Sequence, residues 1–319
     1  AQSFHLDAEQ HRWFDYWLKG IDNGIMDEPP VTYWLLGADA DDPWRSANAW
    51  PVSGVETHEL FFGAGPTGTS TSVNDGRLGA ARPEYGSDPY TVDLSTTTGP
   101  ANRFANLYGG EGRTRPLAEG WQFGYPDLAV NDAKGLTYTG EPLDEALELV
   151  GHPVVRVWIE SDQRVDVFAY LEAVGPDGFS RYLSEGCLRS SHRAVAEAPY
   201  AFLGMPWHPG GGGDLEGISE ERVELAFDLQ PVGTLVAAGD RLRVTLTGAD
   251  RDADSDGDID GIDVNFILLT LAKKYRFLTD YSVKVAGEDD NHEGCHVTVT
   301  AVLFDDCLLY TSPSPRDRG

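Results

Sequence analysis

The sequence predicts a mainly β protein, in which one helix and one strand precede a β-sandwich. The 319-residue chain contains 36 glycines and 19 prolines, a turn-rich composition that favours short strands over a helical bundle. Apolar and polar residues also alternate with a period of two in several runs, as they do in strands that bury one face. Many short strands separated by turns are typical of a two-sheet sandwich.

The first predicted element is a helix over residues 7–20, followed by a short apolar strand over residues 31–36. Asp7 is placed to cap the first free amides of this helix, and Gly20 supplies a left-handed stop. The remaining pattern is helical, because large apolar residues recur on one face. These residues are Trp13, Phe14, Trp17 and Leu18.

The strands of the sandwich follow from the alternation. Residues 59–62 predict its first strand, and a Gly-Pro-Asp-Gly turn at residues 175–178 follows one of the later ones. The clearest period-two runs are residues 165–171, 223–229, 242–246 and 297–303.

Several segments, in one order, resemble a known family of enzymes. Residues 12–31, RWFDYWLKGIDNGIMDEPPV, are similar to the last helix and following strand of the hydrolase domain in CocE/NonD serine hydrolases, which include cocaine esterase and X-Pro dipeptidyl-peptidase. Residues 136–162, 167–193 and 236–252 look like the carboxy-terminal jelly-roll of that family.

The resemblance implies a division of the chain. Residues 1–58 would be the end of an α/β-hydrolase domain, and residues 59–306 a galactose-binding-like jelly-roll with an insertion at residues 252–277. Residues 307–319 resemble a translated sequencing adapter, and we predict that they are a non-native tail. The family's catalytic Ser, Asp and His all lie upstream of the segment that matches residues 12–31, so we expect a carboxy-terminal fragment.

No catalytic residue is predicted in this chain. The GxSxG nucleophile elbow of α/β-hydrolases does not occur in the sequence. Cys187 and His192 are five residues apart, and on a strand an odd offset would point them to opposite faces, so we expect no cysteine nucleophile. The resemblance implies that the intact parent hydrolyses a small ester or peptide substrate through an acyl-enzyme, with the sandwich covering one side of the active site.

Residues 252–263, DADSDGDIDGID, predict a calcium site. A calcium loop supplies oxygen ligands at positions 1, 3, 5, 7, 9 and 12, with glycine at position 6. Gly257 takes position 6, and the alternative is a solvated acidic turn. Six acidic residues this close repel one another without a cation, so we expect structural Ca²⁺ and no organic cofactor. The predicted ligands are Asp252, Asp254, Asp256, Asp258 through its carbonyl, Asp260 and Asp263.

A weaker metal pattern occurs in the sequence HEGCH. It offers His292, Cys295 and His296 but no identifiable fourth ligand, so we predict a surface turn there.

The net charge of −28, from 52 acidic and 24 basic residues, argues against nucleic acid or an anionic membrane as a partner. The expected partner is the α/β-hydrolase domain of the same intact protein. A homodimer is also possible from the sequence. The rival interpretation is a calcium-stabilised sandwich that binds carbohydrate or protein, for which the aromatic helix at residues 12–20 would have no use. The cellular location is undetermined, with an extracellular or periplasmic one preferred.

Overall fold

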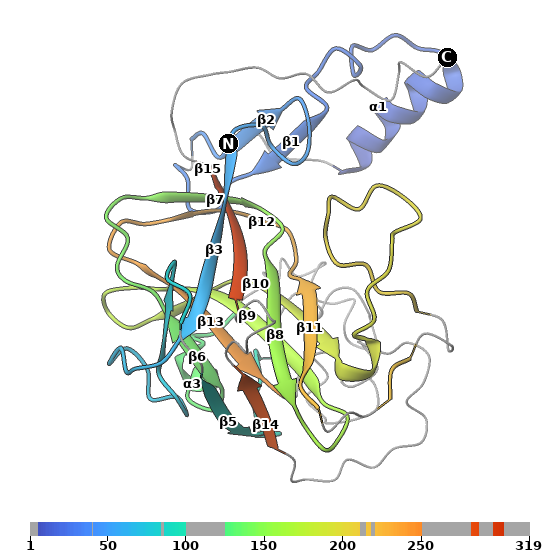
Figure 1. The fold of residues 1–319 in the computed structure, drawn as a ribbon. Helices are drawn as coiled ribbons and strands as arrows, with labels where there is room; N and C mark the ends of the chain where they lie inside the picture. The colour runs from blue at the N-terminus through green and yellow to red at the C-terminus, as the bar shows by residue number, and fades with distance from the viewer. Residues whose placement is uncertain are drawn as a thin grey trace.

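A β-sandwich carries an N-terminal segment at one end of the molecule (Figure 1). The computed structural model describes residues 6–39, 41–83, 86–99, 125–210, 215–217, 221–250, 282–286 and 296–302. The mainly β fold predicted from the sequence is confirmed. In this part of the chain, no helix is long and apolar enough to cross a membrane.

The N-terminal segment consists of helix α1 and a separate two-stranded antiparallel sheet, and the sandwich contains the other thirteen strands of the described chain. The elements of the N-terminal segment are α1 (Leu6–Lys19), β1 (Val31–Trp34) and β2 (Trp44–Ala47). The elements of the sandwich are β3 (Val55–Gly63), β4 (Gly76–Gly79), β5 (Ser87–Thr91), α3 (Ala129–Asp132), β6 (Leu136–Thr139), β7 (Leu147–Gly151), β8 (Val154–Glu160), β9 (Asp166–Val174), β10 (Ser180–Arg189), η2 (Ser190–His192), β11 (Val223–Asp228), β12 (Val232–Val236), β13 (Arg241–Thr247), β14 (Ser282–Ala286) and β15 (His296–Val302).

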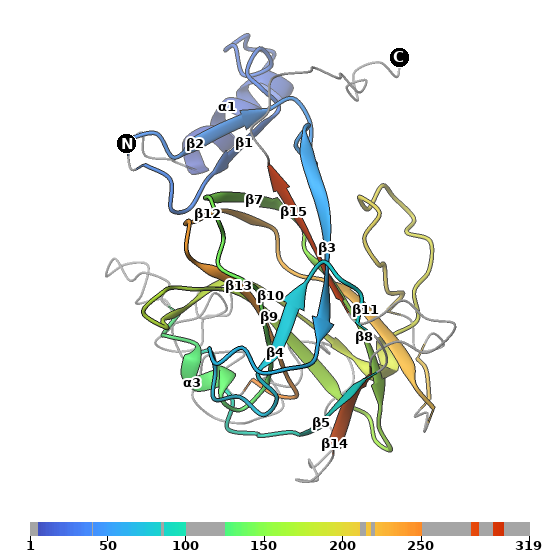
Figure 2. The same cartoon turned by 60° about the vertical axis from the view of Figure 1, so that its left-hand side comes forward.

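The strand pairings of the sandwich form one continuous path, β10-β9-β13-β6-β4-β3-β15-β8-β14-β5, with β11 paired to β8 and β12 to β7. The β4–β6 pair is parallel, whereas β4 pairs with β3 in the antiparallel sense. Figure 2 shows β4 beside β3, at the place where the two layers are joined.

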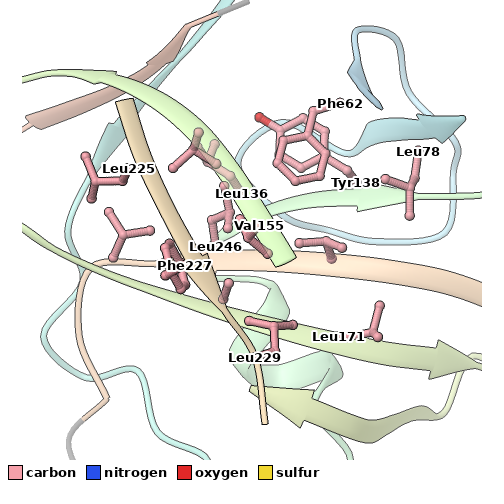
Figure 3. Packing of buried hydrophobic residues seen from close by; sticks show 14 of the residues in the cluster. Phe62, Leu78, Leu136, Tyr138, Val155, Leu171, Leu225, Phe227, Leu229 and Leu246 are labelled. Atoms are coloured by element: carbon pink, nitrogen blue, oxygen red, sulfur yellow. The ribbon is translucent and has the colours of Figure 1, made fainter. Parts of the chain in front are cut away.

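The hydrophobic core lies between the strands β6, β9 and β13 on one side and β8 and β11 on the other (Figure 3). Leu171 of β9 and Leu246 of β13 come from the first layer, and Val155 of β8 and Phe227 of β11 come from the second. All four side chains are at most 2% exposed. Their alternation along each strand is the period-two pattern in the sequence, so the pattern placed the core correctly.

The predicted strand runs at residues 165–171, 223–229, 242–246 and 297–303 correspond to β9, β11, β13 and β15. The predicted turn is also present, since the amide of Gly178 donates to the carbonyl of Gly175 at 2.9 Å and Gly178 has a φ of 86°.

The half-buried character predicted for β9 is wrong, because both of its faces are buried. Val167, Ala169 and Leu171 face the core, whereas Tyr170 and Glu172 lie on the opposite face and are at most 1% exposed. The opposite face is covered because α3 and loops far away in the sequence pack over it and bond to the neighbouring strand β13.

Candidate functional site: the aromatic face of the N-terminal segment

Helix α1 is stabilised at its surface by charge pairs and ends at a glycine. Arg12 contacts Glu9 at 2.7 Å and also Glu28, which lies beyond the helix; these carboxylates raise the pKa of the guanidinium. Asp7 lies within the first turn of α1 (Leu6–Lys19) and not at the cap, which corrects the role predicted for it.

The predicted helix stop is confirmed. Gly20 has a φ of 68°, and its amide donates to the carbonyl of Tyr16 at 3.1 Å. A side chain at this position would be strained by the positive φ, which explains why glycine ends the helix.

The apolar face of α1 is exposed to solvent over the second half of the helix and at Ile21, just beyond its end. Trp13 and Trp17 contact each other with ring centroids 5.7 Å apart, one turn apart on the helix. Large apolar side chains with this exposure, gathered on one face, are typical of a surface that another chain or domain covers. The residues of this aromatic face, 47% to 77% exposed, are Trp13, Phe14, Trp17, Leu18 and Ile21.

The N-terminal segment is hydrogen-bonded to the sandwich at the end of β1. The amide of Leu36 donates to the carbonyl of Gly233 at 2.9 Å, and the amide of Leu235 donates back to the carbonyl of Leu36 at 2.7 Å. Leu35 is buried between these contacts, at 1% exposure. Gly37 follows with a φ of 81°, and a Cβ there would lie 3.0 Å from the carbonyl oxygen of Leu235. The segment is therefore fixed to β12 through its backbone.

A second feature, the buried charged cluster, lies on the outer face of the β9–β13 sheet. Arg243 of β13 lies directly opposite Glu172 of β9 in the strand register. Its guanidinium nevertheless donates elsewhere: to Asp132 Oδ2 at 2.6 Å, to Thr139 Oγ1 at 2.9 Å and to the carbonyl of Thr69 at 2.9 Å. The cluster thereby ties α3 and the loop around Thr69 to the sheet.

The two carboxyl groups of this cluster are bonded differently. Asp132 accepts from Arg243 through Oδ2 and from the hydroxyl of Thr245 through Oδ1 at 3.0 Å. Glu172 accepts from the hydroxyl of Ser180 at 2.5 Å through Oε2. Burial raises the pKa of Glu172 well above its ordinary value, and the nearby charge of Asp132 adds to this effect. Burial also raises the pKa of Asp132, against the opposing influence of Arg243.

A neighbouring polar contact closes the end of β13. Asp250 accepts from the hydroxyl of Tyr170 at 2.9 Å and from the hydroxyl of Thr98 at 2.6 Å. Burial raises the pKa of the Tyr170 phenol well above its ordinary value, with the charge of Asp250 adding to it. This contact is structural, since all of its oxygens are buried among strands and the loop before residue 99.

The residues predicted to bind calcium, at positions 252–263, lie outside the described residues, as do His292 and Cys295. His296 begins β15. Within the described ranges, no three His, Cys, Asp or Glu side chains come together as a metal site.

Cys187 and His192 are not on one strand, contrary to the geometry used in the sequence prediction. Cys187 lies on β10, opposite Phe168, but His192 belongs to the short helical turn η2. Just after β10, the amide of Ser190 donates to the carbonyl of Val165 at 2.8 Å, and the amide of Val165 donates to the hydroxyl oxygen of Ser190 at 3.1 Å. The His192 Nδ1 lies 3.2 Å from the hydroxyl of the adjacent Ser191.

Comparison with known proteins gives the family. The model of the X-Pro dipeptidyl-peptidase C-terminal non-catalytic domain matches residues 23–257. The chain belongs to this family. The resemblance noted in the sequence is thereby confirmed at the level of the family, and residues 23–257 are a C-terminal non-catalytic domain of the X-Pro dipeptidyl-peptidase type.

The curated relatives of this C-terminal domain are longer proteins. A candidate serine esterase of Mycobacterium bovis, Mb1866c, is 34% identical over 252 residues, which are 77% of this chain and 36% of the relative. A candidate Xaa-Pro dipeptidyl-peptidase of Streptomyces avermitilis is 24% identical over 259 residues, 76% of this chain and 35% of the relative. The chain therefore spans about a third of the length of these relatives (36% and 35%).

Solved structures agree on the fold. A CocE/NonD family hydrolase from Staphylococcus aureus is similar with a TM-score of 0.58 and 17% identity, over 92% of this chain and 45% of its own. An aminopeptidase from a marine sediment Thaumarchaeota archaeon is similar with a TM-score of 0.56 and 17% identity, over 92% of this chain and 44% of its own.

The sequence prediction missed the buried charged cluster of this C-terminal domain. One sequence feature could have indicated it. A strand face in contact with water usually carries lysine and glutamate, whereas the outer positions of these strands carry threonines. These residues are Thr137, Thr139, Thr245 and Thr247, all at most 2% exposed.

Proposed function

We propose that this chain is the accessory sandwich of a serine hydrolase that cleaves esters or the peptide bond after an X-Pro pair. In this proposal the catalytic serine belongs to an α/β-hydrolase domain that docks on the aromatic face of α1. The sandwich then contributes stability and shape to the active site and takes no part in the covalent steps.

The observation that carries the proposal is the exposed aromatic face on a segment that is itself fixed to the sandwich. Two tryptophans, Trp13 and Trp17, are about half exposed, at 48% and 55%. Burying one such side chain contributes roughly 1.5–3 kcal/mol, so a domain that covers several of them would gain substantial binding free energy. The names of the relatives, a candidate esterase and a candidate dipeptidyl-peptidase, support the two substrate classes.

The docking surface is tested by polar substitution of the aromatic face. We expect the chain on its own to self-associate in light scattering and to bind a hydrophobic dye, and the double variant Trp17→Gln/Leu18→Gln to do both less. The matched control is Val130→Gln, because Val130 is 72% exposed but lies on α3, outside this face. A monodisperse chain that binds no dye, or an equal effect of the control, would contradict the docking surface.

The hydrolase assignment is tested by reading the source DNA upstream of Ala1. An open frame that continues into a GxSxG block supports the proposal. A start codon immediately before Ala1 would overturn it and leave the aromatic face to be explained as the binding surface of a free-standing module.

A further inference from the structure

The buried charged cluster contains two carboxyl groups and one cation. Glu172 and Asp132 are each 0% exposed, and Arg243 is 1% exposed. If both carboxyl groups were ionised, the cluster would carry one uncompensated negative charge away from water. A carboxylate in that position takes up a proton in preference to remaining charged.

The hydrogen bonds show which oxygen has room for that proton. Both oxygens of Asp132 accept from donors, namely Arg243 and Thr245. In Glu172, Oε2 accepts from Ser180, whereas Oε1 is buried and has no donor among the described residues. Ionised Asp132 and ionised Glu172 would be hydrogen-bond acceptors only, and the nearby charge of Asp132 helps to raise the pKa of the Glu172 carboxyl, so a proton on Glu172 removes that repulsion.

We propose that Glu172 is a neutral carboxylic acid at neutral pH, and that its proton keeps the buried charged cluster as a lock, which fastens α3 and the loop around Thr69 to the sheet. In this arrangement Asp132 keeps its charge and pairs with Arg243, so the cluster has no net charge. Alkaline pH removes the proton and weakens the lock.

The groups around Glu172 favour its protonated form over an ionised form paired with a cation. Arg243 faces it from β13 and Asp132 from α3. Tyr182 lies opposite it on β10, and Asp127 accepts from the amide of Ser180 at 2.8 Å. Among the described residues, Arg243 is the cation that acts on Glu172, and its guanidinium is already bonded to Asp132, Thr139 and Thr69.

The direction of the pH effect follows from the raised pKa. Below the ordinary pKa of 4.5, both the folded and the unfolded chain carry the proton on Glu172. Above it the unfolded chain releases the proton and the folded chain keeps it, so the ratio of folded to unfolded chain falls about tenfold for each pH unit from this group. The loss continues until the pH passes the raised pKa of the folded state.

The experiment compares the chain with Glu172→Gln between pH 5 and pH 9. Glutamine has the shape of the neutral acid and cannot release a proton. From urea unfolding, we expect the unfolding constant of the unsubstituted chain, divided by that of the variant, to rise about tenfold per pH unit from pH 5 to pH 7. The control Glu59→Gln, at an exposed position of β3, should leave the pH dependence unchanged.

A second measurement reports the proton directly. Infrared difference spectroscopy at pH 7 should show the carbonyl band of a protonated carboxylic acid in the unsubstituted chain and not in Glu172→Gln. Equal pH dependence in the two proteins overturns the proposal. So does a carboxylic-acid band that is missing from the unsubstituted chain or persists in the variant. If Glu172→Gln fails to fold, a carboxylic-acid band missing from the unsubstituted chain still overturns the proposal.

Discussion

Replacing Arg243 with methionine should destabilise the fold severely, because it leaves a buried carboxylate without its cation. The guanidinium donates to Asp132 at 2.6 Å and to Thr139 and Thr69 at 2.9 Å, and both Arg243 and Asp132 are at most 1% exposed. Removing one partner of a buried ion pair costs about 3–5 kcal/mol. This is a large part of the roughly 5–15 kcal/mol by which a domain is stable.

Urea unfolding followed by tryptophan fluorescence measures this loss. With a urea dependence of about 2 kcal/mol per molar, the expected cost lowers the midpoint by roughly 1.5–2.5 M. The matched control is Arg156→Met, because Arg156 pairs with Glu224 at 2.8 Å but both side chains are more than a third exposed, at 35% and 40%. Exposed pairs contribute about 0.2–1 kcal/mol, so this midpoint should move by at most about 0.5 M.

The pair also predicts a specific coupling. In Arg243→Met/Asp132→Asn the buried charge is absent, so the double variant should lose clearly less stability than the sum of the two single variants. If Arg243→Met costs no more than Arg156→Met, or if the two substitutions simply add, the cluster does not contain a desolvated ion pair and our reasoning about it is wrong.

Two further outcomes are expected. Gly186→Ala should lower the free energy of unfolding by about 1–3 kcal/mol, because a Cβ there would lie 2.5 Å from the carbonyl oxygen of Asp228. The control Gly79→Ala places its Cβ with no atom within 4 Å and should change stability by less than about 0.5 kcal/mol. Equal urea midpoints for the two variants would contradict this. We also propose that residues 252–263 bind Ca²⁺, so the melting temperature should rise with the ion and fall with a chelator. Asp256→Asn should reduce the difference between these two melting temperatures. A melting temperature that does not change with Ca²⁺ would refute the site.

The strands were predictable because their signal is local. In β13, Leu242, Val244 and Leu246 alternate with polar residues, and that alternation alone places three side chains in the core. The turn at Gly178 and the helix stop at Gly20 are equally local, since each depends on one residue that tolerates a positive φ. The role of Asp7 in α1 was predicted incorrectly because an acidic residue is as favourable in the first turn of a helix as at its cap.

The buried charged cluster was not predictable in the same way. Arg243, Glu172 and Thr139 occupy the polar positions of their strands, which a period-two pattern assigns to solvent. Their burial depends on Asp132, which bonds Arg243 from 111 positions away in the sequence, and on Thr69, 174 positions away. Alternation distinguishes the two faces of a strand but does not reveal whether a distant segment covers the polar one.

Two features of this chain, its buried charges and its exposed aromatic side chains, bear on the proposed docking surface. A self-sufficient domain exposes its charges and buries its large apolar side chains, yet here Arg243 and Glu172 are at most 1% exposed and Trp17 and Leu18 are 55% and 77% exposed. Arg243 bonds Asp132, Thr139 and Thr69, and Glu172 bonds Ser180, so these contacts of the buried charges lie within the described sandwich. The aromatic side chains of α1 gain no comparable burial from the sandwich, although Leu35 and Leu36 fasten the segment to it. We therefore propose α1, and not the outer face of the β9–β13 sheet, as the docking surface.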